Sequence, residues 1–228
     1  MPLRIIDAIP IKVDPFLGPE FGFFALAETN SANPLPINPV IQQESQWCWA
    51  ACVEMVMEAS ATPQVQCQVV THFPGNKPAG DPCQDSNIFR DIGCAIPEMG
   101  EVWSSLNVKF ELILKPAEPG QPALQFDALV NEITAGRPIE VGIKWHGGRG
   151  GHAMLVKGFG EIDGRRAVWI NDPLGATTKF GPGVRGGEGQ ILFRDLREAN
   201  GYGKWVCSWI KLTLNTPDTT NTTNPIEG

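Results

Sequence analysis

The sequence has no basic run and no long apolar run, and these absences exclude several classes of protein. Its 18 lysines and arginines are outnumbered by 25 acidic residues, so nucleic acid and anionic membranes are disfavoured as partners. No segment approaches the roughly 18 apolar residues of a transmembrane helix. The six cysteines include no Cys-x-x-Cys pair, which disfavours a structural zinc site. Neither glycine-rich stretch has the lysine of a nucleotide-binding P-loop.

Length and composition predict one globular domain with irregular ends. The 228 residues are 42% hydrophobic, enough for one sizeable core. We expect an irregular arm or pro-segment over 1–35, the domain over 36–214 and a disordered tail over 215–228. The tripeptide 25–27 resembles a signal-cleavage site, but prolines and acidic residues interrupt the stretch before it. We therefore expect no Sec signal, and either a cytoplasmic location or export by a signal-peptide-independent system.

The strongest chemical signal is a cysteine at the start of a predicted helix. Apolar residues favour a helix from about Cys48 to Ala59, which places the Cys48 thiol beside free backbone amides. A helix N-terminus and an imidazolium partner can lower a thiol pKa from about 8.5 to roughly 3.5–7.5. Cys48 is therefore the candidate nucleophile. A buried structural thiol is the alternative, since free cysteine is among the most buried residue types.

A general base must come from one of three histidines. His152 follows the glycine-rich stretch 147–151 and opens the apolar run 153–156, so we expect it at the first position of a buried strand. A base held there would be rigid, while the loop before it would leave room for substrate. His146 is the second choice because it precedes the same loop, and His72 is expected to be an ordinary surface residue.

Two further positions complete a candidate site. A predicted strand ends at Asn171 and Asp172, and one of these could hydrogen-bond the far ring nitrogen of the base. A shift of one residue would exchange the two, and a turn-forming Asn-Asp-Pro is the alternative. Gln42 lies six positions before Cys48, so a short loop could aim its amide at an oxyanion, a contact worth about 3 to 4 kcal/mol. Gln43 could replace Gln42 if the loop register differs by one.

These motifs resemble the papain-like cysteine peptidases. The quoted residues are Gln42, Trp47-Cys48-Trp49-Ala50-Ala51, His152-Ala153 and Gly158-Phe159-Gly160. The version seen here is most similar to a bacterial branch with staphopain-like, bacteriocin-leader and plant-pathogen effector peptidases. The resemblance implies a nucleophile on the central helix of a helical N-terminal lobe, and Asp172 rather than Asn171 as third member. It also implies a disulfide among Cys67, Cys83 and Cys94.

The resemblance also implies a reaction. Cys48, His152, Asp172 and Gln42 would hydrolyse a peptide or protein substrate through a thioester, with no metal or organic cofactor. A bacterial effector or toxin role would follow from the branch. A deamidase, another amidase, a transpeptidase or a non-catalytic binding module of the same fold are the alternatives. The segment 19–24 is similar to the site that effector relatives cut, which would place self-cleavage after Gly22; an apolar arm packed on the domain is the other interpretation.

The order of predicted elements favours an α+β fold, because helices come first and antiparallel strands follow. We expect further helices over 64–72 and 123–135 and a helical turn over 86–92. Expected strands cover 108–114, 139–144, 152–158, 166–170 and 205–214, with a hairpin turn at Asp163-Gly164. The glycine-rich stretches 147–151 and 181–189 are expected to be mobile loops.

Overall fold

A computed structural model describes residues 34–59, 62–74, 80–84, 92–115, 121, 123–148 and 150–214. All of these belong to the compact unit Ser31–Gly228. The predictions for residues 1–33, including cleavage after Gly22, and for the tail 215–228 lie outside the described residues, as does nearly all of the helical turn predicted over 86–92.

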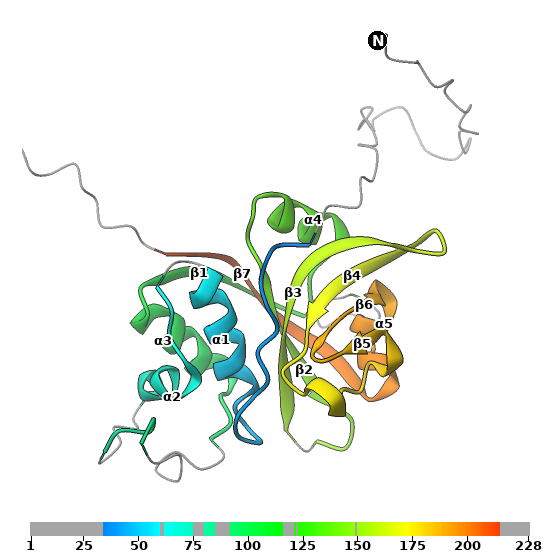
Figure 1. Cartoon of the computed structure of the whole chain (residues 1–228). Coiled ribbons are helices and arrows are strands. Elements are labelled where there is room, and N and C mark those ends of the chain that lie inside the picture. Colours follow the sequence, from blue (N-terminus) through cyan, green and yellow to red (C-terminus); the bar gives the residue numbers. More distant parts are fainter. Residues whose placement is uncertain are drawn as a thin grey trace, which may run out of the picture. The chain divides into compact units, whose positions relative to one another are not determined.

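Three helices gather on the same side of the sheet (Figure 1). They are α1 (Cys48–Ala59), α2 (Gln66–Val69) and α3 (Ile96–Ser105). Eight of the twelve residues of α1 are buried, which is the pattern of a central core helix and not of an amphipathic surface helix. Trp103 of α3 is fully buried in the same hydrophobic cluster as Trp49 and Val53 of α1. The start of α1 is therefore fixed by packing on several sides.

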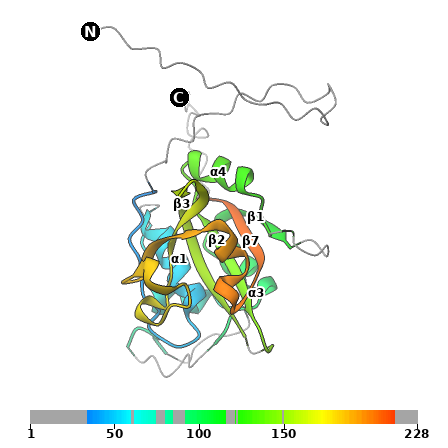
Figure 2. The ribbon, with the colours of Figure 1, turned by 90° about the vertical axis from the view of Figure 1, so that its right-hand side faces the viewer.

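Within the described residues the sheet has seven strands, all paired in antiparallel fashion, in the order β1-β7-β2-β3-β4-β6-β5. The strands are β1 (Val108–Leu114), β2 (Ile139–Trp145), β3 (Gly151–Ile162), β4 (Arg165–Asn171), β5 (Val184–Arg185), β6 (Glu188–Leu192) and β7 (Gly203–Leu214). Two more helices are α4 (Phe126–Thr134), which Figures 1 and 2 both label, and α5 (Phe193–Arg197), which lies beside β4, β6 and β7.

The central strands separate two hydrophobic clusters. Residues Ile139, Val141 and Ile143 of β2 belong to the cluster that includes α4 and α5. Successive side chains of a strand point to opposite faces, so Glu140 and Gly142 lie on the other face, toward α1 and α3. Glu140 indeed accepts a hydrogen bond from the Trp103 indole of α3. An ionisable side chain thus lies against the helical part of the core.

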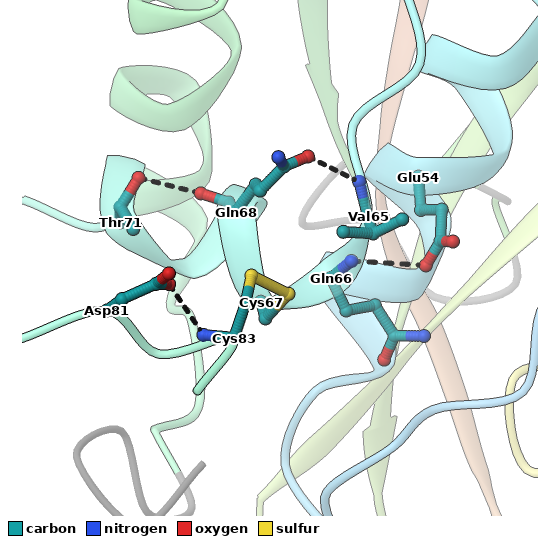
Figure 3. The surroundings of a disulfide bond; sticks show 8 residues. All are labelled: Glu54, Val65, Gln66, Cys67, Gln68, Thr71, Asp81 and Cys83. Carbon is teal, nitrogen blue, oxygen red and sulfur yellow. Dashed lines mark hydrogen bonds between the residues drawn. A yellow bond between two sulfur atoms is a disulfide. The ribbon is translucent and has the colours of Figure 1, made fainter. Parts of the chain in front are cut away.

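A disulfide joins Cys67 of α2 to Cys83, which confirms the bridge expected from the family resemblance (Figure 3). Polar bonds order both sides of it. The backbone amide of Gln66 donates to the Glu54 carboxylate of α1, and the backbone amide of Cys83 donates to the Asp81 carboxylate. The bridge therefore ties a loop to α2, and the hydrogen bond from Gln66 ties α2 to the helix that carries Cys48. The remaining cysteines of the described part of the chain, Cys48, Cys52, Cys94 and Cys207, are free.

The predicted α+β class and most predicted elements are confirmed. The helix Cys48–Ala59 and the strand Val108–Leu114 have the predicted bounds, and Asp163 and Gly164 form the hairpin turn with φ of 52° and 69°. The predicted helix 64–72 is shorter, because its last part is a 3-10 helix over Val70–His72.

Three predictions about structure were wrong. The helix α3 was missed, since proline, glycine and cysteine nearby favoured only short turns. The helix α5 was also missed. The stretch 181–189 is not a free loop: it contains β5 and the start of β6, joined at Gly186 and Gly187, whose φ values of 59° and 88° suit a tight hairpin. In the described part of the chain no helix has the length and apolar character needed to cross a membrane.

Candidate active site

Cys48 is the first residue of α1, as predicted, and its side chain is only half-buried. The residue before it, Trp47, is fully buried, and its carbonyl accepts the Ala51 amide at 3.0 Å. The helix therefore begins at a point where the chain is anchored in the core. The backbone amide of Ala153, on β3, donates to Cys48 Sγ at 3.4 Å. The cysteine and the strand that carries His152 thus meet directly.

His152 and Asp172 form a buried pair next to this contact. The antiparallel pairing of β3 with β4 brings the end of β4 beside the start of β3, and Asp172 follows β4. His152 Nε2 lies 2.7 Å from Asp172 Oδ1, and the two side chains are 3% and 0% exposed. Trp145 stacks on the imidazole with ring centres 5.7 Å apart and an angle of 15°. The ring plane is therefore fixed, and Nδ1 is left for the interaction with Cys48.

The pKa values of the three groups favour a thiolate beside an imidazolium. Burial raises the pKa of Cys48, but hydrogen bonding and charge attraction from His152, with the Ala153 and Trp49 amides, bring it below its ordinary value. Burial lowers the pKa of His152, but Asp172 and Cys48 more than offset this and raise it to about 9. Burial likewise raises the pKa of Asp172, and its hydrogen bonds outweigh burial and lower it. Each charge stabilises the next.

Asp172 is held by contacts on every side of its carboxylate. Besides His152, Oδ1 accepts the Leu174 amide at 2.9 Å, and Oδ2 accepts the Thr178 hydroxyl. The backbone amide of Asp172 donates to the Gly187 carbonyl at 2.6 Å. A Cβ at Gly187 would lie 2.8 Å from an Ile41 methyl and 3.1 Å from the Asp172 carbonyl oxygen. The glycine-rich hairpin thus supports the third member of the site.

The other candidates face elsewhere. Asn171 Nδ2 donates to the Ile37 carbonyl at 3.0 Å and contacts Met55 Sδ of α1, so its amide does not face His152. His146 is exposed at the end of the β2 hairpin. His72 pairs with the Ser105 hydroxyl at 2.9 Å, at the end of α3. Among the two alternatives left open for the third position, the structure brings Asp172 to the histidine.

Gln42 lies beside the site but is engaged by its own loop. Its Nε2 donates to the carbonyls of Glu44 at 2.9 Å and Ser45 at 2.7 Å, while Oε1 is buried without a hydrogen-bond partner. Its backbone amide donates to the Pro173 carbonyl, next to Asp172. Gln42 is not among the residues that line the cleft at Cys48. An oxyanion contact from Gln42 therefore requires one of its amide hydrogens to leave a loop carbonyl.

Gln43 does not take its place, because it is exposed and its backbone is bound to Gln66. The buried Gln66 side chain accepts the Gln43 amide at 2.9 Å and donates to the Ile41 carbonyl at 3.0 Å. Two residues of the loop before Cys48 are thus clamped by a single glutamine of α2. Its orientation is set at the same helix that the disulfide anchors.

A cleft of about 650 Å³ opens at Cys48 and His152. It is walled on one side by α3 and the segment before it and on the other by β2 and β7, and Gly148, Gly150 and Gly151 contribute to its rim. Three residues at or next to the site could not be predicted from the sequence: Trp145, Thr178 and Glu140. Only Glu140 had a local signal, since it is a single acidic residue in an otherwise apolar stretch. In the described residues, no group of three His, Cys, Asp or Glu side chains could hold a metal ion.

The profile of the Peptidase_C39 like family matches residues 35–180. The chain belongs to this family. Membership supports the predicted papain-like cysteine peptidase, and the matched range includes Cys48, His152 and Asp172. The bacterial branch within those peptidases stays a prediction. No curated protein matches the chain.

The fold of the chain is similar to solved structures of peptidases, at low sequence identity. One is a double glycine motif protease from an AMS/PCAT transporter in complex with the leader peptide, at 14% identity and a TM-score of 0.44, covering 78% of this chain and 94% of that one. Another is a putative C39-like peptidase from Bacillus anthracis, at 13% identity and a TM-score of 0.47, covering 77% of this chain and 95% of that one. A third is a digestive procathepsin L2 proteinase from Tenebrio molitor larval midgut, at 14% identity and a TM-score of 0.39, covering 76% of this chain and 64% of that one.

Proposed function

We propose that the protein is a cysteine endopeptidase that cleaves peptide bonds through a thioester on Cys48. The observation that carries the proposal is the arrangement at the start of α1. Cys48 has a lowered thiol pKa beside a histidine whose other ring nitrogen is bound to a buried carboxylate. A nucleophile, its base and the group that orients the base are the three parts that covalent acyl transfer needs.

Each residue has a distinct task in this mechanism. Cys48 Sγ attacks the peptide carbonyl carbon, and a carbon–sulfur bond forms as the carbonyl oxygen becomes anionic. His152, held protonated by Asp172, gives its proton to the departing amine when the carbon–nitrogen bond breaks. Water then attacks the thioester, His152 takes a proton from it, and the Cys48 thiolate leaves. One water is consumed, and the products are a carboxylic acid and an amine.

The oxyanion would be held by the backbone amide of Cys48 and by Gln42. Helix N-terminal amides are suited to this because α1 leaves them without carbonyl partners. Gln42 supports the proposal less directly, since its Nε2 is bound to Glu44 and Ser45. We expect Gln42→Ala to reduce the rate of peptide cleavage by about 100- to 1,000-fold if the amide reaches the oxyanion. A reduction below about threefold would assign that task to the backbone alone.

The test is hydrolysis of a mixed peptide library, with products identified by mass spectrometry. Wild type should cleave peptides, and Cys48→Ala and His152→Ala should not. Two matched controls are available: Cys52→Ala removes a thiol one helical turn from Cys48, in the core, and His146→Ala removes an exposed imidazole near His152. Both should retain cleavage.

Other products would assign another reaction to the same site. Transfer of the acyl group to an added amine without hydrolysis would identify a transpeptidase. Loss of ammonia from glutamine or asparagine side chains would identify a deamidase. If an iodoacetamide-type reagent does not discriminate Cys48 from the other thiols, the chain is a binding module of the same fold.

Self-cleavage after Gly22 is part of the same proposal. The segment is outside the described residues, and its sequence alone supports the idea. The intact mass of freshly purified wild type should show loss of residues 1–22, while Cys48→Ala should keep them. A wild-type chain of full mass would exclude self-cleavage without affecting the proposed peptidase activity.

A further inference from the structure

Glu140 is a fully buried carboxylic acid that the proposed mechanism does not use. It lies on β2, on the face that the strand turns toward α1 and α3. One carboxyl oxygen, Oε2, accepts the Trp103 indole at 3.0 Å. The other, Oε1, is buried and has no hydrogen-bond partner. A buried polar atom without a hydrogen-bond partner lowers the stability of the fold, so a carboxylic acid at this position needs an explanation.

Glu140 is one of the residues that line the cleft at Cys48, and its carboxyl group is buried behind the cleft surface. The same cleft wall includes Gly142 and Cys207, and a Cβ at Gly142 would lie 2.4 Å from Cys207 Sγ. Glycine at that position therefore lets β7 close over the strand without filling the cleft. The wall opposite is apolar, with Ile96, Pro97 and Met99. Among the described residues that line the cleft, Glu140 is the one with an acidic side chain, and the wall formed by α3 is apolar.

The groups that face Glu140 are mostly neutral thiols. They are Cys52 of α1, Cys94 before α3 and Cys207 of β7, and burial raises the pKa of all three, so they carry no charge. Cys48 also faces it, with the charge of its thiolate balanced by protonated His152. Lys144 lines the outer part of the cleft and is exposed to solvent. No cation beside Glu140 is available from these residues to satisfy Oε1.

We propose that Glu140 is a specificity-determining residue that binds the ammonium group of a lysine side chain of the substrate. The proposal rests on the proposed function and adds the substrate class. The lysine stem would contact the apolar walls, and its terminal nitrogen would donate to Oε1. Because Oε1 is closed off from solvent, the carboxyl group rotates into the cleft to make this contact. Arginine fits less well, since its guanidinium favours both carboxylate oxygens and Trp103 holds one of them.

The test uses alkylation of Cys48 by dipeptidyl chloromethyl ketones. Two pairs of probes carry lysine or norleucine at either of the two positions; norleucine has the same unbranched stem but no ammonium group. With wild type, the lysine probe of one pair should alkylate Cys48 at least about tenfold faster than its norleucine partner. Glu140→Gln keeps the size of the side chain and an acceptor for Trp103. It should bring that ratio close to one, with the norleucine rate unchanged.

A second measurement needs no variant. Burial raises the pKa of Glu140 to about 8, although the Trp103 hydrogen bond opposes this, so binding an ammonium at lower pH expels a proton. The ratio of lysine to norleucine rates in wild type should therefore rise about tenfold per pH unit below pH 8 and level off above it. Taking the ratio removes the titration of Cys48 and His152, which both probes share.

The outcomes separate the two proposals. Equal rates for lysine and norleucine at both positions, with Cys48 as the labelled residue, would overturn the role of Glu140 and leave the peptidase proposal intact. A glutamine probe that alkylates Cys48 as fast as the lysine probe would also overturn it, because it would show that the charge of the side chain does not affect binding. If the probes label no cysteine in preference to the others, both the peptidase proposal and the role of Glu140 are overturned. A lysine preference that Glu140→Gln abolishes, together with the pH trend, would establish the inference.

Discussion

Two buried carboxyl groups should respond to pH in opposite ways, and this can be measured as stability. Burial raises the pKa of Glu140 from an ordinary 4.5 to about 8, against the effect of its Trp103 hydrogen bond. One pKa unit corresponds to about 1.4 kcal/mol, so ionising Glu140 within the fold costs on the order of 5 kcal/mol. The favourable contribution of protonated Glu140 is complete below pH 4.5. It is lost as the pH rises through about 8.

The perturbation is Glu140→Gln, which does not titrate and still accepts the Trp103 N–H. At pH 5 the free energies of unfolding of wild type and variant should agree within about 1 kcal/mol, because both side chains are neutral. At pH 9 the variant should be more stable by several kcal/mol, on the order of 5 at most. Urea unfolding at pH 5, 7 and 9, followed by tryptophan fluorescence, measures the difference.

Glu132→Gln is the matched control. The hydrogen bond from Arg137 lowers the pKa of Glu132, so its contribution is present above the ordinary carboxyl pKa and is lost as the pH falls. Arg137 binds both of its oxygens, at 2.7 and 2.9 Å. The control variant should therefore be less stable than wild type at pH 7 and should approach it in acid. Parallel stability curves for wild type and Glu140→Gln from pH 5 to 9 would refute the reasoning about Glu140.

Three further expectations follow from single contacts. Gly142→Ala places a Cβ 2.4 Å from Cys207 Sγ and should lower the free energy of unfolding by about 1–3 kcal/mol in urea titrations; adding Cys207→Ala should restore most of it, and an unaffected Gly142→Ala would contradict the packing. Cys67→Ser opens a disulfide between residues 16 positions apart and should lower the free energy of unfolding by about 3 kcal/mol, seen as a lower thermal midpoint of the oxidised protein. An unchanged midpoint would show that the bridge adds no stability. Asp172→Asn removes the charge that keeps the pKa of His152 near 9, so the alkaline limit of peptide cleavage, which needs protonated His152, should move to lower pH; an unmoved limit would remove Asp172 from that role.

Sequence reasoning located the parts of the site that have local signals. Cys48 lies at the start of an apolar helical segment, and His152 follows a glycine-rich stretch and opens an apolar strand, so each could be placed on its element. Their meeting could be expected only from the family resemblance, because the contact between α1 and β3 joins segments about 105 residues apart in the sequence. The structure shows the Ala153 amide at Cys48 Sγ.

Contacts between distant segments could not be predicted. Thr178 reaches the Asp172 carboxylate from a 3-10 turn, and Gly187 supports its backbone from a hairpin that had been taken for a loop. The Gln42 amide was expected beside the sulfur, but the carbonyls of its own loop bind it. Such competition between local partners depends on loop geometry that residue type does not encode. The packing of Glu140 under Trp103 is of the same kind.

The pH dependence of Cys48 alkylation tests the central claim most directly, namely that Cys48 and His152 form a thiolate–imidazolium pair. Iodoacetamide labelling at Cys48, quantified by mass spectrometry across pH 4 to 10, reports the thiolate fraction. We predict a midpoint below the value of about 8.5 for a free cysteine in wild type, and an upward shift in His152→Ala. A wild-type midpoint at or above 8.5, or one that His152→Ala leaves in place, would contradict the account.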